Sequence, residues 1–456
     1  MKSYDNIIIG FGKGGKTIAG ALAGKGESVA LIEKSPKMYG GTCINVACIP
    51  SKSLENSARN SFLMGGDFTD RAKRYREAIE EKRRLTSMLR GKNYQKAVSA
   101  GVEVIDGEAS FLDSHRLSVA FADGSTEEFY GGRIFINTGS SPFLPPIEGL
   151  QESSHVYTSE TLMELDELPK RLAIIGGGYI GLEFASYYTN FGSQVTIIQD
   201  NETFIPREDA EVAASVLSNL EERGMKILRG AKTQSIEDRD GFAVLNLDTK
   251  EGSIQLEADA VLVATGRRPN LSSLHPEAAG IELTDRGAVK VDEHLRTSVP
   301  HIWAMGDVKG GLQFTYISLD DSRIVKSQIL GDGSRTTQNR GAVPYTVFLD
   351  PPLSRVGLSE EEAKKQGYDY KTAVLQTSAI PRSHVVGKPV GMLKAIVDSK
   401  TGLILGAHFF CAESAEMINL IKLAMDMKIP YTVLRDNIYN HPTMSESLND
   451  LFASVH

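Results

Sequence analysis

Hydrophobic and polar positions define two similar units along the chain. The apolar run Ile7–Ile9 leads into a glycine-rich turn, a segment with helical periodicity and a second apolar strand that ends at Glu33. The same order recurs at 171–198, where an apolar strand leads into GGGYIGLE and a helical segment. A buried strand followed by a glycine turn and a helix is typical of the βαβ unit of a parallel sheet. The pattern therefore predicts two α/β units.

The rest of the chain follows different patterns. Residues 53–99 are predicted to be mostly helical, and residues 101–136 contain strand-like pieces around the turn Ala122–Gly124. From about residue 341 strands and helices mix in an α+β pattern. The proline-rich stretch Pro142–Pro146 and the segment Arg267–Asn270 are predicted to be domain boundaries. A chain of 456 residues is expected to divide into about three domains.

Composition narrows the class of protein. With 41% hydrophobic and 24% charged residues and no long apolar run, the chain is expected to be globular and soluble, without a membrane span. It begins without the features of a secretory signal, which predicts a cytoplasmic location. The net charge of -8 argues against nucleic acid as a partner. The basic run Arg71–Arg90, with Lys82, alternates with acids and is expected to be a solvated helix face.

The first unit carries a dinucleotide fingerprint. Gly10, Gly12 and Gly15 form GxGxxG directly after a strand, which permits close approach of a pyrophosphate to a helix N-terminus. Glu33 ends the next strand, where its carboxylate can accept hydrogen bonds from ribose hydroxyls. The combination predicts a dinucleotide site rather than a purely structural turn.

The second unit carries a similar fingerprint, formed by Gly176, Gly178 and Gly181. Its second strand ends at Gln199 rather than an acid, so neither a ribose-binding carboxylate nor its repulsion of a 2′-phosphate is present. Arg207 is more simply a surface residue than a phosphate ligand. The nicotinamide form stays open between NADH and NADPH, with a lean to NADPH.

A close cysteine pair is the main candidate for chemistry. The chain has three cysteines, and Cys43 and Cys48 lie within GGTCINVACIPSK, where a helix is expected to begin. A helix N-terminus favours thiolate, the form that attacks sulfur. Structural zinc would ordinarily need four ligands, and no second cysteine pair exists. A redox pair is therefore favoured over a metal site and over inert core cysteines.

Several motifs in order resemble the class I pyridine nucleotide-disulfide oxidoreductases, which include dihydrolipoamide dehydrogenase, glutathione reductase and mercuric reductase. They are GGTCINVACIPSK, INTGS, GGGYIGLE, ATGRRPN, WAMGDV and HPTMSE, and they extend over nearly the whole chain. The resemblance implies FAD, NADH or NADPH, and a homodimer with shared active sites. It implies an α/β fold with two Rossmann-like domains and a C-terminal α+β dimerisation domain. The expected division is a FAD-binding domain at 1–148, an NAD(P)-binding domain at 149–270, a return segment completing the FAD domain at 271–340, and the interface domain at 341–456.

The resemblance also implies roles for single residues. Cys48 would be the flavin-side thiol and Cys43 the interchange thiol that meets substrate. Lys52 would lie by the flavin and pair with Glu183, while Tyr179 would cover the nicotinamide pocket. The residues expected to bind FAD are Gly10, Gly12, Gly15, Glu33, Lys52, Thr138, Gly139 and Asp307, and those expected to bind NAD(P) are Gly176, Gly178, Tyr179, Gly181, Gln199 and Gly266.

The C-terminal region adds two further candidates. His441 and Glu446 resemble the acid-base dyad of the family, in which the partner subunit's histidine manages the proton of the interchange thiol. Cys411 follows an apolar stretch and is expected to be a buried core residue, with a third redox thiol as the alternative.

Within the family, the sequence is most similar to the hypothiocyanous acid (HOSCN) reductase group, which includes a bacterial reactive-chlorine-resistance flavoprotein. The shared segments are IIGFGKGGKT, MYGGTCIN, GGLQFTYISLDD, PPLSRVG, IPR and HPTMSESLNDLF. Tyr316-Ile317 stands where dihydrolipoamide dehydrogenase usually has His-Lys, and no cysteine lies in the last 45 residues to relay electrons or capture mercury. The resemblance implies reduction of HOSCN in oxidant defence, with Phe314, Tyr316 and Tyr345 as candidates for narrowing access. A Hg(II) or Cu(II) reductase, dihydrolipoamide dehydrogenase and a redox-responsive regulatory or assembly protein remain alternatives.

Overall fold

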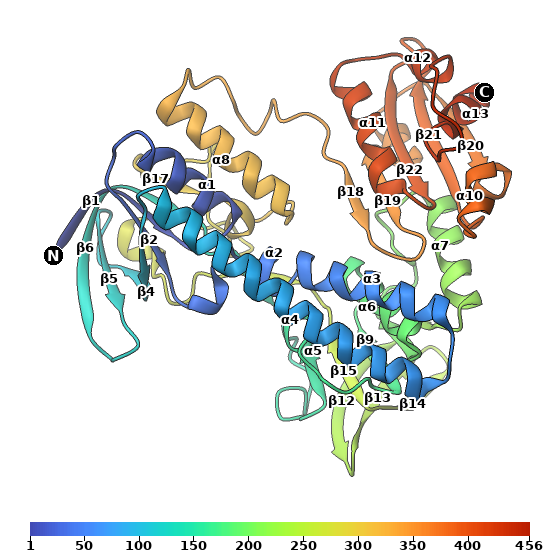
Figure 1. The fold of residues 1–456 in the computed structure, drawn as a ribbon, viewed down its shortest axis with the longest axis horizontal. Helices are drawn as coiled ribbons and strands as arrows, with labels where there is room; N and C mark the ends of the chain where they lie inside the picture. Colours follow the sequence, from blue (N-terminus) through green and yellow to red (C-terminus); the bar gives the residue numbers. More distant parts are fainter.

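The computed structural model describes residues 1–456 as three lobes (Figure 1). Two lobes contain a mainly parallel sheet, and the third contains an antiparallel sheet. No helix combines the length and apolar character needed to cross a membrane. The mixed α/β class expected from the sequence is confirmed.

The first sheet has the strand order β3-β2-β1-β6-β5-β4, and β17 pairs with the end of β6. Ile7 and Ile8 are fully buried because β1 lies between two parallel neighbours and is covered on both faces. Residues 302–304 thus add a strand to the sheet formed by the N-terminal part of the chain. The strands are β1 (Lys2–Ile9), β2 (Val29–Glu33), β3 (Glu103–Asp106), β4 (Glu108–Phe111), β5 (Arg116–Ala120), β6 (Thr126–Ile136) and β17 (Ile302–Ala304).

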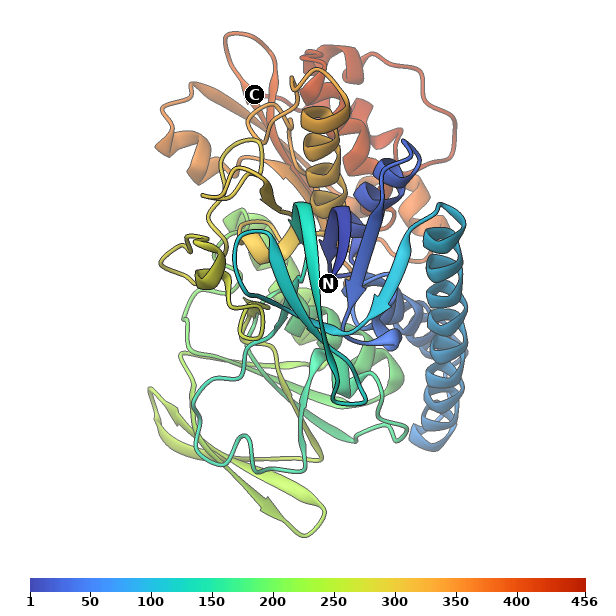
Figure 2. The same cartoon turned by 90° about the vertical axis from the view of Figure 1, so that its left-hand side faces the viewer.

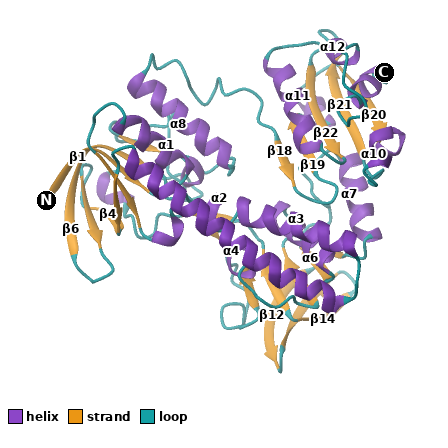
Figure 3. Cartoon of the chain, viewed as in Figure 1, coloured by secondary structure: helices purple, strands orange, loops and turns teal.

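Two helices cover one face of this sheet (Figure 3). They are α1 (Lys13–Ala23), which begins in the first glycine fingerprint, and α8 (Thr315–Leu330). Ile18 of α1 and Ile324 of α8 share a core with Ile8 and Trp303. The return segment therefore supplies both a strand and a covering helix to the first lobe.

The second lobe has five parallel strands in the order β11-β10-β9-β15-β8. Beside them lies an antiparallel sheet of β12, β13 and β14, and β7 and β16 form a separate short antiparallel pair. The strands are β7 (Ser140–Pro142), β8 (Val156–Thr158), β9 (Arg171–Ile175), β10 (Gln194–Gln199), β11 (Lys226–Arg229), β12 (Lys232–Arg239), β13 (Phe242–Thr249), β14 (Gly252–Ala258), β15 (Ala260–Val263) and β16 (Arg267–Pro269). Its helices are α5 (Ser159–Leu162), α6 (Tyr179–Phe191) and α7 (Ala210–Glu222).

Two helices connect the first two lobes. They are α3 (Cys48–Met64) and α4 (Phe68–Ser99), which stands along one edge of the molecule in Figure 2. Asp67 and Asp70 form a capping box at the start of α4. Leu54 of α3, Tyr75 of α4 and Tyr187 of α6 share one core. The helix that begins at Cys48 is therefore packed directly against the second lobe.

The expectation of a wholly solvated basic face on α4 is wrong at Lys82. Its side chain is only 1% exposed, and its ammonium donates to the carbonyl of Met163 at 2.6 Å and pairs with Glu164. Burial lowers the pKa of Lys82, and the hydrogen bond to Glu164 opposes that effect. A segment 81 positions away provides these partners, so the local charge pattern of α4 contained no sign of them.

The third lobe contains the antiparallel sheet β18-β19-β22-β21-β20. Its strands are β18 (Tyr345–Val347), β19 (Leu353–Gly357), β20 (Tyr370–Gln376), β21 (Met392–Asp398) and β22 (Ile404–Phe410). Its helices are α9 (Glu360–Lys365), α10 (Pro381–Val385), α11 (Ser414–Asp426), α12 (Tyr431–Arg435) and α13 (Ser447–Ala453). The remaining short helices are α2 (Thr42–Asn45) and the 3₁₀ turns η1 (Pro36–Met38), η2 (Pro276–Ala279), η3 (Gly306–Lys309) and η4 (Thr377–Ala379).

Candidate active site

The two candidate redox cysteines lie in two consecutive helices. Cys43 belongs to α2, and Cys48 is the first residue of α3, so the helix start expected near the pair is divided between two helices. Both residues are partly exposed and reduced. Gly41, just before α2, has φ +80°, and a Cβ there would come within 2.6 Å of the Gly12 Cα. The cysteine segment is therefore packed against the first glycine fingerprint.

The surroundings favour a thiolate on Cys48. A hydrogen bond from Cys43 lowers the pKa of Cys48, burial raises it, and Thr315 and the charge of Lys52 lower it further. The Thr315 Oγ1 lies 3.4 Å from the Cys48 Sγ. The same hydrogen bond, followed by burial, raises the pKa of Cys43 well above its ordinary range. In the reduced pair the negative charge therefore resides on Cys48, and Cys43 needs a base before it can attack.

Lys52 and Glu183 form the ion pair that the resemblance implies. Lys52 lies one turn into α3 and Glu183 lies in α6, so the pair joins the cysteine helix to the helix of the second fingerprint. The second carboxylate oxygen of Glu183 accepts a hydrogen bond from the backbone N–H of Phe348 at 2.9 Å. The Lys52 ammonium lies 4.8 Å from the centre of the Phe348 ring. Three segments that are distant in sequence thus meet beside Cys48.

The first fingerprint is closely packed around Asn137. A Cβ at Gly10 would lie 2.3 Å from the Asn137 carbonyl oxygen, and Gly10 has φ +101°. The Asn137 side chain accepts from the Gly15 N–H at 2.7 Å and donates to the Met305 carbonyl at 2.7 Å. It therefore joins the start of α1 to the segment that carries Asp307. Glu33 accepts from the Phe11 N–H at 3.0 Å, and burial raises its pKa.

Residues that follow β6, together with Asp307, fit the FAD that the resemblance implies. The Thr138 Oγ1 is buried without a hydrogen-bond partner, and a Cβ at Gly139 would meet nothing closer than 3.8 Å. Asp307 accepts from the Ser140 hydroxyl at 2.7 Å. An open backbone position, an unsatisfied hydroxyl and a carboxylate are suited to the hydroxyl and phosphate groups of FAD.

The second fingerprint has open space where the first is crowded. A Cβ at Gly178 or at Gly266 would meet no atom within 4 Å, which leaves room for a dinucleotide. Gly181 is tight, because a Cβ there would lie 2.2 Å from the Gly176 carbonyl oxygen. The Gln199 amide donates to the Asn201 carbonyl at 2.6 Å, and its Oε1 lies against the glycine turn. Tyr179, the first residue of α6, follows Gly178 directly.

His441 and Glu446 form a dyad, and neither is hydrogen-bonded to a cysteine within the chain. The His441 Nδ1 is 2.8 Å from the Glu446 Oε2, and the histidine side chain is 71% exposed. The hydrogen bond from His441 lowers the pKa of Glu446. Figure 1 places α12 and α13, between which the dyad lies, at the end of the third lobe distant from α2.

Sequence reasoning missed three side chains near the sulfurs and the second fingerprint. They are Thr315, which contacts Cys48; Lys16, whose ammonium donates to Asn93 at 2.6 Å; and Glu208, which accepts from Tyr345 at 2.6 Å. Burial, followed by repulsion from Lys13, lowers the pKa of Lys16 to about 8, and the charge of Cys43 opposes this. Lys16, in α1 directly after the last glycine of the fingerprint, was the detectable case, because it lies in a segment already quoted for the resemblance.

The three aromatic residues proposed to narrow access lie together. Phe314 stacks on Tyr316 with ring centres 5.2 Å apart and on Tyr345 at 5.9 Å. Burial and then the charge of Cys48 raise the pKa of Tyr316. This aromatic group therefore lies beside the sulfur pair. Its effect on access stays a prediction.

Comparison with known proteins identifies the family. The profile described as "Pyridine nucleotide-disulphide oxidoreductase" matches residues 4–322, and the profile of the dimerisation domain of that family matches residues 343–452. The chain belongs to the pyridine nucleotide-disulphide oxidoreductase family. It is therefore an enzyme of the flavoprotein disulfide reductase type, and the family uses FAD and NAD(P)H.

Relatives of several activities align over nearly the full chain. The probable pyridine nucleotide-disulfide oxidoreductase RclA of Escherichia coli (strain K12) is 48% identical, with 100% of both chains covered. A mercuric reductase of Staphylococcus aureus is 34% identical over 98% of this chain and 81% of its own. A dihydrolipoyl dehydrogenase of Mycobacterium bovis is 35% identical over 99% of this chain and 98% of its own.

The similarity extends to solved structures. The HOCl-induced flavoprotein disulfide reductase RclA from Escherichia coli superposes with a TM-score of 0.92 at 48% identity, covering 99% of both chains. The Cu(II) complex of that protein gives a TM-score of 0.93 with the same identity and coverage. The expected family, fold class, enzyme class and cofactors are thus confirmed.

Proposed function

We propose that this enzyme uses NAD(P)H and FAD to reduce HOSCN to thiocyanate through Cys43 and Cys48, in protection against oxidants. The supporting observation is where the three cysteines lie. Cys411 is fully buried, and the chain has no other cysteine besides the reactive pair. Without a third accessible thiol to relay electrons, the acceptor has to react at Cys43 itself. A small electrophilic sulfur compound suits such a site.

The proposed reaction begins when the partner subunit's His441 accepts the proton of the Cys43 thiol, and the resulting thiolate attacks the sulfur of HOSCN. A sulfur–sulfur bond forms, the sulfur–oxygen bond breaks, and His441 gives a proton to the departing hydroxide, which leaves as water. The Cys48 thiolate then attacks the Cys43 sulfur and expels thiocyanate. The two cysteines are left as a disulfide, oxidised by two electrons, and the HOSCN has gained those electrons.

When bound, FAD would supply the redox chemistry that links NAD(P)H to this disulfide. We propose the FAD contacts at Gly10, Gly12, Gly15, Glu33, Lys52, Thr138, Gly139 and Asp307, and the NAD(P) contacts at Gly176, Gly178, Tyr179, Gly181, Gln199 and Gly266. Lys52, held by Glu183, is proposed to lie at the flavin edge. The domain division at 148, 270 and 340 is proposed on the same basis.

The dyad requires a second subunit in this proposal. Because α12 and α13, which flank the dyad in sequence, lie far from α2 within one chain, we propose a homodimer in which the partner subunit's His441 faces Cys43. Glu446 orients the imidazole by accepting from Nδ1. Free thiols as catalytic groups and only three cysteines suit a reducing compartment, so we propose a cytoplasmic location.

Reduction of Cu(II) is the second candidate. Its support is the Cu(II) complex of the Escherichia coli relative, together with the affinity of thiolates for soft metal ions. Within this one chain no group of three or more His, Cys, Asp or Glu side chains is arranged to hold a metal ion. The Cys43 and Cys48 thiolates with the partner subunit's His441 would have to form such a site.

One experiment separates the candidates. The purified yellow protein is reduced anaerobically and mixed separately with HOSCN, lipoamide, oxidised glutathione, Hg(II) and Cu(II), and reoxidation of the flavin is followed by absorbance. We expect HOSCN to react fastest. Faster reoxidation by Cu(II), or by any of the other three acceptors, would reject the HOSCN assignment in favour of that acceptor.

A further inference from the structure

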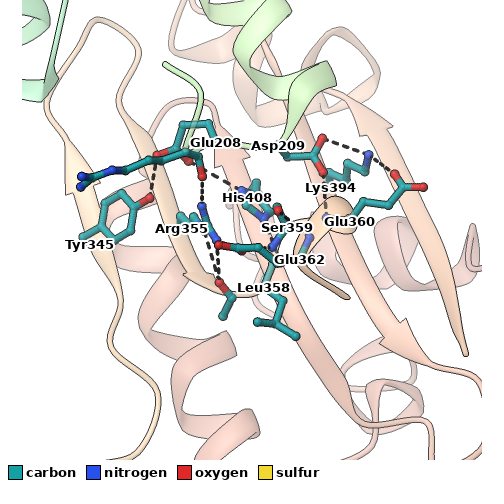
Figure 4. Close-up of polar contacts among 12 residues, drawn as sticks. Glu208, Asp209, Tyr345, Arg355, Leu358, Ser359, Glu360, Glu362, Lys394 and His408 are labelled. Atoms are coloured by element: carbon teal, nitrogen blue, oxygen red, sulfur yellow. Dashed lines mark hydrogen bonds and ion pairs between the residues drawn. The ribbon is translucent and has the colours of Figure 1, made fainter. Parts of the chain in front are cut away.

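A buried carboxylate lies between the second fingerprint and the third lobe (Figure 4). Glu208 follows β10 and precedes α7, and its side chain has no exposed surface. One of its oxygens, Oε1, accepts from the hydroxyl of Tyr179 and from that of Tyr345 at 2.6 Å. The two tyrosine hydroxyls are themselves 3.1 Å apart. A single carboxylate oxygen thus holds two tyrosines from different lobes.

The environment keeps this carboxylate charged. Burial raises the pKa of Glu208, but its contacts with His408, Tyr179 and Tyr345 outweigh burial and leave the pKa below its ordinary value. The His408 Nδ1 lies 3.8 Å from the other oxygen, Oε2, and its Nε2 is bonded to the Leu358 carbonyl at 3.1 Å. Oε2 makes no hydrogen bond within the chain. The tyrosine hydroxyls are therefore the main donors to a buried charge, and losing either one is costly.

Tyr345 also connects the second fingerprint to the sulfur pair. Its ring stacks on Tyr179, with centres 5.5 Å apart, and on Phe314 at 5.9 Å. The residue after Phe314 is Thr315, whose hydroxyl contacts Cys48. The rings of Tyr179, Tyr345 and Phe314 thus form a continuous stack between the second fingerprint and the sulfurs. Glu208 lies at the end of this stack nearer the fingerprint.

We propose that Glu208 is a positioning residue that latches Tyr179 over the nicotinamide pocket, and that Tyr345 is the reserve donor for its carboxylate when Tyr179 moves aside. This inference rests on the proposed function, in which Tyr179 covers that pocket. Binding of the nicotinamide requires the Tyr179 hydroxyl to leave Glu208. The latch therefore lowers the apparent affinity for NAD(P)H, and Tyr345 limits that loss by staying bound to the carboxylate.

The two donors give opposite predictions for single substitutions. Glu208→Gln weakens the latch, so the dissociation constant of the nicotinamide should fall by about fivefold, as expected for loss of one charge-assisted hydrogen bond. Tyr179→Phe removes the same bond from its other end and should give the same shift, with no further gain in the double variant. Tyr345→Phe removes the reserve donor, so displacement of Tyr179 becomes harder and the dissociation constant should rise.

The test measures binding of NADP⁺ and of NAD⁺ to the oxidised holoenzyme by calorimetry, with the nucleotide that the wild type binds more tightly used for the variants. Asp209→Asn is the matched control, because Asp209 is equally buried and adjacent but contacts Lys394 and neither tyrosine. Its affinity should equal that of the wild type. Unfolding temperature and flavin content are recorded for each variant.

Opposite shifts for Glu208→Gln and Tyr345→Phe support the latch, and shifts in the same direction, or none, overturn it. If Glu208→Gln does not fold, the dissociation constants of Tyr179→Phe and Tyr345→Phe test the latch in the same way. The rate at which dithionite-reduced Glu208→Gln is reoxidised by HOSCN should not change, whereas a general structural defect would slow it. Failure of the wild type to bind either nucleotide would reject the proposed function itself, which distinguishes the two outcomes.

Discussion

The hydroxyl of Thr315 lies 3.4 Å from the sulfur of Cys48, although 267 positions separate the two residues. Thr315 is the first residue of α8, and Cys48 is the first residue of α3. Two helices thus begin at the same point, and both direct the positive end of their backbone dipole toward the sulfur. The return segment of the first lobe therefore contributes directly to the chemistry of the cysteine pair.

Thr315→Val should destabilise the thiolate of Cys48 and so raise the pKa of that residue. One hydrogen bond to a charged sulfur is worth about 1.5 kcal/mol, roughly tenfold in proton affinity. The long-wavelength absorbance of the reduced holoenzyme, which reports a thiolate beside the flavin, should therefore titrate at higher pH in this variant. Thr315→Ser keeps the hydroxyl and serves as the control. An identical titration in the valine variant would show that the hydroxyl does not stabilise the charge.

In the wild type the thiolate of Cys48 should be lost as the pH is lowered. The pKa of Cys48 is lowered to about 6, chiefly by the hydrogen bond from Cys43, so its thiolate is present above that pH and is lost as the pH falls through it. The long-wavelength absorbance of the reduced holoenzyme should persist at pH 7 and decline toward pH 5. A decline centred where ordinary free thiols titrate, well above neutrality, would mean that the surroundings do not stabilise the thiolate.

Glu183→Ala should destabilise the protein more than Glu183→Gln. Alanine removes the ion pair with Lys52 and also leaves the backbone N–H of Phe348 without its acceptor. A lost acceptor for a partly buried N–H costs about 1–3 kcal/mol in unfolding free energy. Glutamine retains an acceptor oxygen, so its loss should be smaller. Urea denaturation of both variants measures the difference, and equal losses would assign the effect to charge alone.

The strands, helices and glycine turns could be predicted because their signals are local. The apolar run at Ile7–Ile9 and the glycines after it specify a strand and a turn within a dozen residues. The cysteine pair was detectable for the same reason, since the chain brings Cys43 and Cys48 together at the junction of two adjacent helices. These features depend on backbone geometry that neighbouring residues determine.

Contacts between lobes could not be predicted in this way. Glu208 and His408 are 200 positions apart and meet only because the second and third lobes pack together. Lys82 has the sequence context of a solvated residue, and its burial depends on the carbonyl of Met163. The periodicity of one helix contains no information about a partner in another lobe. For the His441 dyad the proposed partner, Cys43, belongs to a second subunit.

A shared active site predicts complementation between two inactive subunits. In a purified heterodimer of Cys43→Ser and His441→Ala chains, one site combines both defects and the other combines an intact cysteine pair with an intact histidine. We expect about half of the wild-type activity from the single intact site. Activity no higher than that of the mutant homodimers would mean that each chain supplies its own histidine.

Cys411→Ser should leave turnover unchanged and reduce stability. Cys411 has no exposed surface and packs among apolar residues of the third lobe, and burial raises the pKa of its thiol. A hydroxyl there is buried in an apolar environment, at a cost of about 1–3 kcal/mol in unfolding free energy. Thermal unfolding and steady-state turnover with HOSCN measure the two effects. A marked loss of turnover in a folded variant would make Cys411 a third redox thiol.

The central claim is that electrons leave the enzyme through Cys43. The most direct measurement compares NAD(P)H consumption with HOSCN in the wild type and in Cys43→Ser, after flavin absorbance has verified that both proteins hold FAD. We predict that Cys43→Ser retains its flavin and loses HOSCN-dependent consumption. Consumption at the wild-type rate in Cys43→Ser would contradict the account.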